Sequence, residues 1–118
     1  ESIEWKKSGG VGKSIIYDIK NNEFYIDGEQ QCCGDKFNGN IGDKKIRSEL
    51  KIDEDYYEMD KYILYGDTQR IYEHISVKIN RVSGDFRHIR MLDMIKEKLP
   101  LSTWIQDGTC EKATEQKF

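Results

Sequence analysis

Residues 72–91 read Tyr72-Glu-His-Ile-Ser-Val-Lys-Ile-Asn-Arg-Val-Ser-Gly-Asp-Phe-Arg-His-Ile-Arg-Met91 and combine a strand pattern with a turn signal. In the first arm Ile75, Val77 and Ile79 alternate with polar residues, as in a strand with one buried and one solvated face. Gly84 lies where a hairpin loop needs a positive φ, which other residues adopt only at a steric cost. The stretch therefore predicts an antiparallel β-hairpin, with its second arm after Gly84.

The same signals recur along the chain and predict a mainly antiparallel β domain spanning residues 1–118. Alternating side chains and turn residues predict strands at 2–7, 14–20, 23–27 and 44–52, with Asn21-Asn22 as a hairpin turn and a last strand around Trp104 and Ile105. We expect about six to eight strands in a sandwich or partly closed barrel, with one or two short helices.

Two segments carry the expected helical structure. Residues 52–67 are expected to begin with a helical turn and to end in a strand at 62–65. Met91, Ile95 and Leu99 are spaced by four residues and Pro100 follows them, which predicts a short helix.

The glycine-rich segment 8–14 is similar to a phosphate-binding loop but departs from it in two ways. Lys7 stands where the first glycine of that motif is required, and the alternating residues after Ser14 predict a strand where the motif opens a helix. A glycine-rich turn is the expected structure.

Composition limits the classes of function. Of the 118 residues 36% are hydrophobic and 35% charged, which indicates a thin core and a charged surface. A formal charge of −3 and the lack of a long basic run argue against nucleic acid as a partner. Apolar runs are too short to span a bilayer.

The cysteines favour an oxidising compartment. Cys32, Cys33 and Cys110 in so small a domain predict one disulfide, from Cys110 to either Cys32 or Cys33, with reduced structural thiols as the alternative. The long loop closed by such a bond is worth about 4 kcal/mol in the chain-entropy model. The first residue is Glu1, which is consistent with a removed export signal.

Two short motifs carry a resemblance. Asn80-Arg81-Val82-Ser83-Gly84, preceded by Ile79, and the ending Gly108-Thr109-Cys110-Glu111-Lys112 with Lys117-Phe118 resemble the C-terminal pattern of short, exported, mostly uncharacterised proteobacterial proteins. The resemblance covers about the last third of the chain. It implies a β-rich periplasmic or secreted domain and implies no activity.

No residue pattern supports catalysis or a cofactor. His74 and His88 are able to face each other across the hairpin, but neither they nor the cysteines have a recognised zinc spacing. None of the serines lies in the G-x-S-x-G motif of a nucleophile elbow. The segment Asp53-Glu-Asp55 lacks the glycine and the terminal glutamate of a calcium-binding loop. We expect no metal, no cofactor and no enzymatic activity.

Residues 52–67 have the most unusual composition of the chain, with six acidic residues and four tyrosines opposed by Lys61 alone. Clustered carboxylates attract a basic protein and tyrosines anchor interfaces. The alternative is a solvated charged face with the tyrosines packed inward. The candidate partner-binding residues are Asp53, Glu54, Asp55, Tyr56, Tyr57, Glu58 and Asp60.

The expected function is that of an exported, non-enzymatic binding protein. The most concrete form is an immunity or inhibitor protein that occludes a basic toxin or hydrolase. The alternative is a binder of a small, lipid-like ligand in a cavity of about 300 Å³ or more between the sheets, lined by Trp5, Trp104 and phenylalanines.

Overall fold

The computed structural model describes residues 3–7, 15–66, 70–93 and 102–113, with the backbone alone at 3–7 and 111–113. These ranges contain ten strands and one short 3-10 helix. The elements are β1 (Ile3–Lys7), β2 (Ile16–Lys20), β3 (Glu23–Ile26), β4 (Glu29–Cys32), η1 (Asp35–Phe37), β5 (Asn40–Ile41), β6 (Lys44–Ile52), β7 (Tyr56–Tyr65), β8 (Ile71–Asn80), β9 (Asp85–Leu92) and β10 (Ser102–Ala113).

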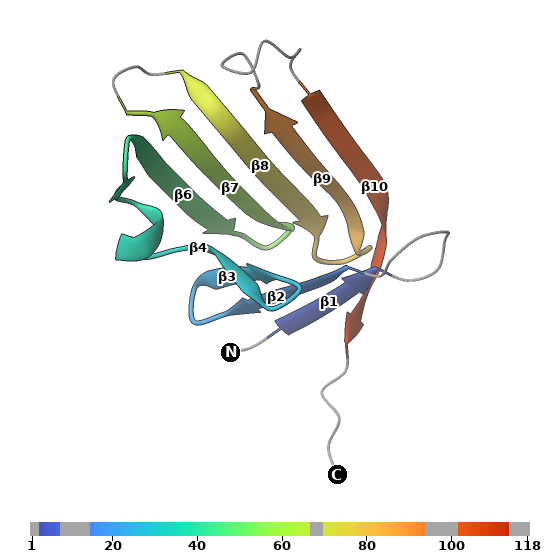
Figure 1. Cartoon of the computed structure of the whole chain (residues 1–118). Helices are drawn as coiled ribbons and strands as arrows, with labels where there is room; N and C mark the ends of the chain where they lie inside the picture. The colour runs from blue at the N-terminus through green and yellow to red at the C-terminus, as the bar shows by residue number, and fades with distance from the viewer. Residues whose placement is uncertain (1–2, 8–14, 67–69, 94–101, 114–118) are drawn as a thin grey trace.

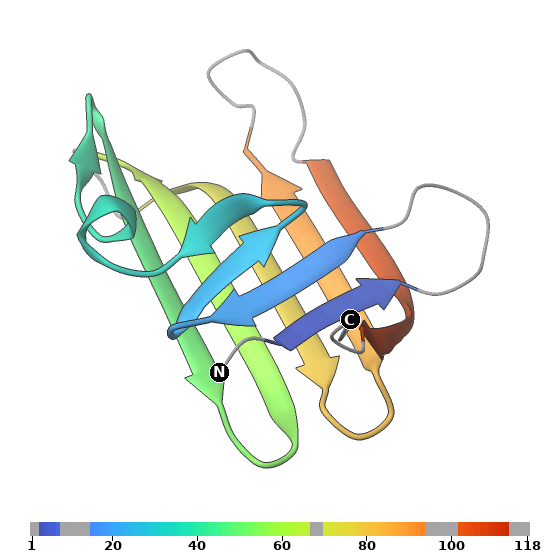
Figure 2. The same ribbon diagram turned by 90° about the horizontal axis from the view of Figure 1, so that it is seen from below.

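The strands form two antiparallel sheets that share one long strand. The strand order is β4-β3-β2-β1-β10-β9-β8-β7-β6-β5. Residues 102–109 of β10 pair with β9 in the larger sheet, and residues 110–113 pair with β1 in the smaller one. The smaller sheet crosses one end of the larger sheet, and no other described strand covers the other end of its inner face (Figures 1 and 2). The antiparallel β prediction is confirmed as two packed sheets that do not close into a barrel.

The predicted central hairpin is the pair β8 and β9. Gly84 has a φ of 80° in the turn, and its backbone N–H donates to the carbonyl of Asn80 at 2.9 Å. Val77 and Ile79 are fully buried, and Ile75 packs against the core that they join. The alternation of apolar and polar residues therefore places the expected face of β8 inward.

The core lies where the smaller sheet covers the larger one. Its members from the larger sheet alternate along their strands, as an antiparallel sheet with one buried face requires. The buried cluster consists of Tyr17, Ile19, Phe24, Cys32, Tyr57, Met59, Val77, Ile79, Phe86 and Cys110. The ring of Phe86 packs closely against Gly108. A Cβ atom at position 108 would lie 2.7 Å from the Phe86 ring.

The first predicted hairpin is also confirmed. Asn21 and Asn22 connect β2 to β3 with φ angles of 53° and 59°, the left-handed conformation that asparagine tolerates and that a two-residue hairpin turn uses.

One predicted helical turn is wrong, and two other predicted segments lie wholly or partly outside the described residues. The helical turn expected after Ile52 is wrong, because residues 53–55 form a turn and β7 then runs without interruption from Tyr56 to Tyr65. Met91 and Leu92 end β9, while residues 94–101, where the predicted helix continues, lie outside the described residues. The glycine-rich segment 8–14 also lies outside them.

Among the described residues, no helix has the length and the apolar character needed to cross a membrane.

Candidate functional site

The predicted partner-binding stretch begins in the turn between β6 and β7. Asp53, Glu54 and Asp55 are exposed there. The Asp53 carboxylate accepts the backbone N–H groups of Tyr56 at 2.7 Å and Asp55 at 2.8 Å. These hydrogen bonds, that of Tyr56 first, lower the pKa of Asp53 below its ordinary value. Asp53 thus stabilises the turn, and Glu54 and Asp55 carry the exposed charges beside it.

The rest of the stretch divides between the two faces of β7. Tyr57 and Met59 point into the core and are 2% and 0% exposed. Tyr56, Glu58 and Asp60 are half-buried on the outer face. Tyr57 therefore belongs to the core and offers no exposed ring to a partner.

Lys78 and His74 of β8 lie against the acidic residues of β7. Lys78 of β8 lies 3.7 Å from the Glu58 carboxylate and 4.3 Å from the centre of the Tyr56 ring. His74 Nε2 lies 3.0 Å from Asp60 Oδ1. These contacts arise from the pairing of β7 with β8, which brings together residues that the sequence separates. Much of the carboxylate charge thus has partners within the chain.

Arg81 joins the β6–β7 turn to the β8–β9 turn. Its backbone N–H donates to the carbonyl of Asp55 at 2.8 Å, and its guanidinium donates to the carbonyl of Asp53. The guanidinium also lies 4.7 Å from the centre of the Tyr57 ring. The two turns consequently project side by side from the same end of the larger sheet (Figure 2).

These two turns, residues 52–55 and 81–84, form a surface that we call the hairpin tips. Val82 is 87% exposed and Ile52 is 43% exposed, so the tips present apolar side chains next to Glu54 and Asp55. A carboxylate group beside an exposed apolar residue suits contact with a protein surface better than a purely solvated face does.

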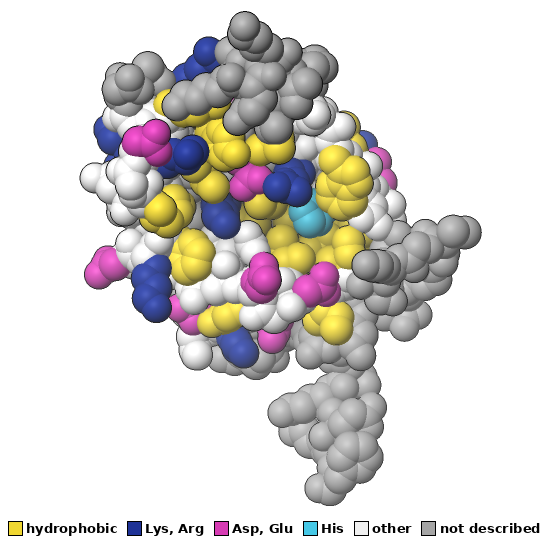
Figure 3. Space-filling model, in the orientation of Figure 1, with side chains coloured by type: hydrophobic (Ala, Val, Ile, Leu, Met, Phe, Trp, Pro, Cys, Tyr) yellow, Lys and Arg dark blue, Asp and Glu magenta, His cyan; other side chains and the backbone are white. Residues whose placement is uncertain are grey.

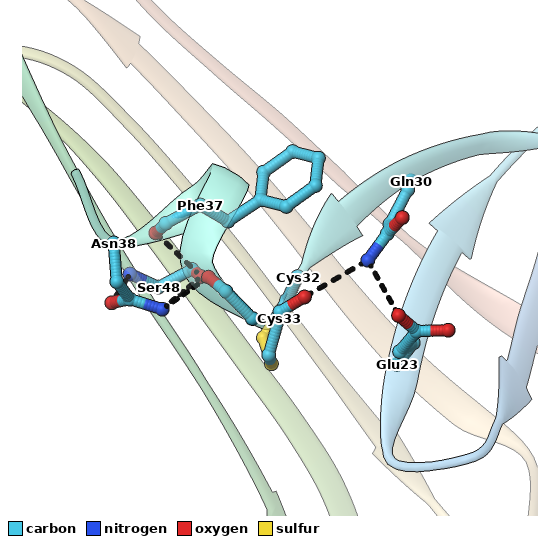
Figure 4. The surroundings of a disulfide bond; sticks show 8 residues. Glu23, Gln30, Cys32, Cys33, Phe37, Asn38 and Ser48 are labelled. Atoms are coloured by element: carbon cyan, nitrogen blue, oxygen red, sulfur yellow. Dashed lines mark hydrogen bonds between the residues drawn. A yellow bond between two sulfur atoms is a disulfide. The ribbon is translucent and has the colours of Figure 1, made fainter. Parts of the chain in front are cut away.

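The predicted disulfide partner is wrong. Cys32 is bonded to the adjacent Cys33, at the corner where β4 leads into η1 (Figure 4). Cys110 is buried in β10. Three strands, β3, β2 and β1, lie between the strands of Cys32 and Cys110 in the sheet order, which is roughly 19 Å along the sheet and well beyond disulfide reach.

The corner that holds the disulfide is tied to the smaller sheet and to β6. Gln30 Nε2 donates to the Cys33 carbonyl and to Glu23 Oε2, each at 2.9 Å. The hydroxyl of Ser48 on β6 donates to the Phe37 carbonyl of η1 at 2.9 Å (Figure 4). The corner thereby bridges the two layers.

The pairing of the two histidines across the hairpin, which the sequence left possible, does not occur. His74 lies opposite Met91, and His88 lies opposite Val77. His74 is on the outer face with Asp60, whereas His88 is on the inner face, because the residue opposite His74 lies three positions beyond His88. Within the described ranges, no group of three metal-binding side chains comes together.

The part of the larger sheet's inner face that no other described strand covers carries a row of residues that the sequence patterns did not bring together. Lys61, Ile75, Arg90 and Trp104 are direct neighbours across β7, β8, β9 and β10, and we call them the inner row. Met59 and Val77, two positions from Lys61 and Ile75, belong to the core, and His88, two positions from Arg90, is buried, so alternation places the row on the same face. Figure 3 shows large hydrophobic side chains, both signs of charge and a histidine gathered on this face.

Arg90 is held by a carboxylate on the inner face. Its Nε and Nη2 both donate to Glu73 Oε2, at 3.0 and 2.8 Å. The Glu73 side chain is 12% exposed, whereas that of Arg90 is 53% exposed. A guanidinium has five N–H groups, so this ion pair leaves Arg90 with further donors at the open face.

The close contacts of Lys61 with other described residues are neutral. Its Nζ donates to Gln31 Oε1 of β4 at 3.2 Å and lies 5.7 Å from the centre of the Phe37 ring. Among the described residues, no carboxylate lies within 4 Å of this ammonium group. Burial lowers the pKa of Lys61, and the more distant Glu73 and Glu29 offset part of that effect.

His88 lies below the inner row and is neutral. Its Nδ1 is 2.8 Å from the Tyr17 hydroxyl and shares a hydrogen bond with it, and burial raises the pKa of Tyr17, which therefore keeps its proton. Burial first, and Arg90 second, lower the pKa of His88 to about 4. The imidazole packs edge-on against Trp104, with ring centres 4.9 Å apart. Trp104 is nevertheless 47% exposed.

A hollow of about 420 Å³ lies elsewhere, at the β5–β6 turn and the end of β7. It does not lie between the sheets and contains neither tryptophan nor phenylalanine. Its lining residues are Asn40, Gly42, Asp43, Lys44, Lys45, Tyr65 and Gly66. This hollow therefore does not correspond to the ligand cavity considered from the sequence.

Comparison of the chain with models of protein families, with curated proteins and with solved structures finds no match. The resemblance to exported proteobacterial proteins stays a prediction.

Proposed function

We propose that this chain is an exported, non-enzymatic binding protein, most concretely an immunity or inhibitor protein that occludes the active site of a basic toxin or hydrolase. Its contact surface is the hairpin tips, together with the outer-face residues Tyr56 and Glu58. The periplasm or the extracellular space is the proposed compartment, since such partners act there.

The observation that carries the proposal is the composition and attachment of the hairpin tips. Exposed carboxylates of Glu54 and Asp55 lie beside Val82, which is 87% exposed, on two turns that Arg81 links. Linked turns lose little conformational freedom on binding, and an apolar residue ringed by charge resembles the core and rim of a protein interface. Two adjacent hairpin turns also have a shape that fits into a concave active site.

The test is surface plasmon resonance against the product of a neighbouring gene at several salt concentrations. Carboxylates that attract a basic partner act mainly on the association rate, and screening over about 8–10 Å weakens that attraction as ionic strength rises. The double variant Glu54→Gln, Asp55→Asn is expected to slow association and to flatten its salt dependence. Val82→Ser is expected to act on the dissociation rate.

The matched control is the double variant Asp35→Asn, Glu49→Gln. It removes the same formal charge from exposed positions on η1 and β6, away from the hairpin tips. Asp53 is left intact because its carboxylate holds the turn. Equal association rates for the two double variants at every salt concentration would remove the hairpin tips as the binding surface.

A further inference from the structure

We infer that the uncovered inner face binds a small monoanionic carboxylate with an apolar body, with the carboxylate at Lys61 and the body extending across Ile75 toward Trp104. This site lies on a different surface from the hairpin tips and does not rest on the function proposed for them.

The charge of the ligand follows from the ions on this face. Glu73 neutralises Arg90 through two hydrogen bonds, whereas Lys61 has a neutral amide and an aromatic ring as its contacts. These three ionised side chains together carry one positive charge, which lies at the half-buried Lys61, and the more distant Glu29 offsets part of it. A partly desolvated ammonium group with no carboxylate within 4 Å among the described residues is unfavourable, and a bound anion lowers that cost.

The same ions select a carboxylate over a phosphate. A dianion would exceed the single net positive charge and would approach Glu73, which is held on the same face by Arg90. A monoanion matches the charge and still has donors available from Lys61 and from the remaining N–H groups of Arg90.

The apolar body follows from the other members of the inner row. Ile75 lies between Lys61 and Arg90 in register, and Trp104 ends the row with nearly half its surface exposed. An exposed indole beside a buried imidazole offers a flat apolar surface, and the aromatic ring of Phe37 lies on the Lys61 side.

The length of the body follows from the sheet. Three strand spacings separate Lys61 from Trp104, which is roughly 14 Å between their Cα atoms. An alkyl chain of about ten carbons, or an arylalkyl group, covers the distance between the two side chains, since each reaches toward the other by several ångströms.

The experiment titrates the full chain with decanoate, below the concentration at which it forms micelles, by isothermal titration calorimetry. Decanol and decyl phosphate serve as the uncharged and the dianionic comparison. Decanoate is expected to bind at least tenfold more tightly than either. Equal affinity for decanol would show that the charge of Lys61 plays no part, and tighter binding of decyl phosphate would contradict the monoanion assignment.

Two variants test the position of the site. Lys61→Met keeps the length of the side chain, removes its charge and is expected to weaken decanoate binding at least tenfold. Lys51→Met removes one charge from an exposed outer position on β6 and is expected to leave the affinity within twofold. Equal affinities for the two variants, or no heat of binding with the unmodified chain at millimolar decanoate, would overturn the inference.

Backbone amide NMR spectra provide the measurement that does not depend on a variant folding. Decanoate is expected to shift the amide signals of Lys61, Ile75, Arg90 and Trp104 in the unmodified chain. Shifts confined to the outer face or to the 420 Å³ hollow would place the ligand elsewhere and refute the assignment.

Discussion

Acidification is expected to destabilise this protein through His88. The imidazole is 7% exposed, and its Nδ1 shares a hydrogen bond with the Tyr17 hydroxyl. A second proton on the ring would place a positive charge in the core near Arg90. The folded protein therefore resists protonation of His88, and its pKa falls to about 4.

The sign and size of the effect follow from the linkage between proton binding and folding. An unfolded chain protonates this histidine near its ordinary pKa of 6.5, so between pH 6.5 and pH 4 the unfolded state binds more protons than the folded state. The stabilisation is fully present above pH 6.5 and is lost as the pH falls toward 4. Between pH 7 and pH 5 the loss is about 2 kcal/mol.

Urea denaturation followed by circular dichroism at pH 7 and pH 5 measures this loss. The comparison variant is His88→Gln, whose amide oxygen accepts the Tyr17 hydroxyl proton but does not titrate. His74 and the carboxylates are common to both proteins, so the difference in pH dependence between them isolates His88. The unmodified chain is expected to lose about 2 kcal/mol more than the variant.

Equal losses of stability in the two proteins would refute this reasoning. So would an NMR titration of the folded chain in which the His88 ring protonates with a midpoint near 6.5, and this second measurement needs no variant.

Two further predictions concern the stretch after β6 and the cysteines. Tyr57→Ala is expected to cost about 3–5 kcal/mol of unfolding free energy in urea because it empties the core, whereas half-buried Tyr56→Ala costs about 1 kcal/mol or less; similar costs would contradict the division of β7 into two faces. Peptide mapping without reductant is expected to find the disulfide within one peptide that contains both Cys32 and Cys33, and a bond that joins this peptide to the one with Cys110 would contradict the structure.

The sequence predicted those parts of the fold that depend on neighbouring residues. The period of two in Ile75, Val77 and Ile79 identified β8 and its buried face, and Gly84 located the turn that follows. The same alternation exists in Tyr57, Met59 and Lys61, but the dense carboxylates around it obscured the pattern and suggested a helical turn. In this segment the acidic composition led to the prediction of a helical turn, although the period of two indicated a strand.

The contacts of the candidate site depend on the register in which neighbouring strands pair, and the sequence of a single segment does not determine that register. The partners of Glu58 and Asp60 are Lys78 and His74, and they meet because β7 pairs with β8 in one particular register. The register of the β8–β9 hairpin differs by three residues from the one that would place His88 opposite His74, and an odd shift moves the two side chains to opposite faces. Trp104 was foreseen as a cavity residue, but its position beside Arg90 required the pairing of β9 with β10.

The shared strand β10 has a consequence for the order in which the chain folds. Each described strand pair joins elements that follow one another in the sequence, except the pairing of β1 with β10, which brings residue 4 to residue 113. Closing so long a loop costs about 4 kcal/mol of chain entropy before any contact compensates it. We therefore expect strand β1 to dock late, after the β6–β10 meander has formed from local hairpins. Its amide hydrogens are then expected to exchange with solvent earlier than those of β8, even though both strands lie inside the sheet order and neither is an edge.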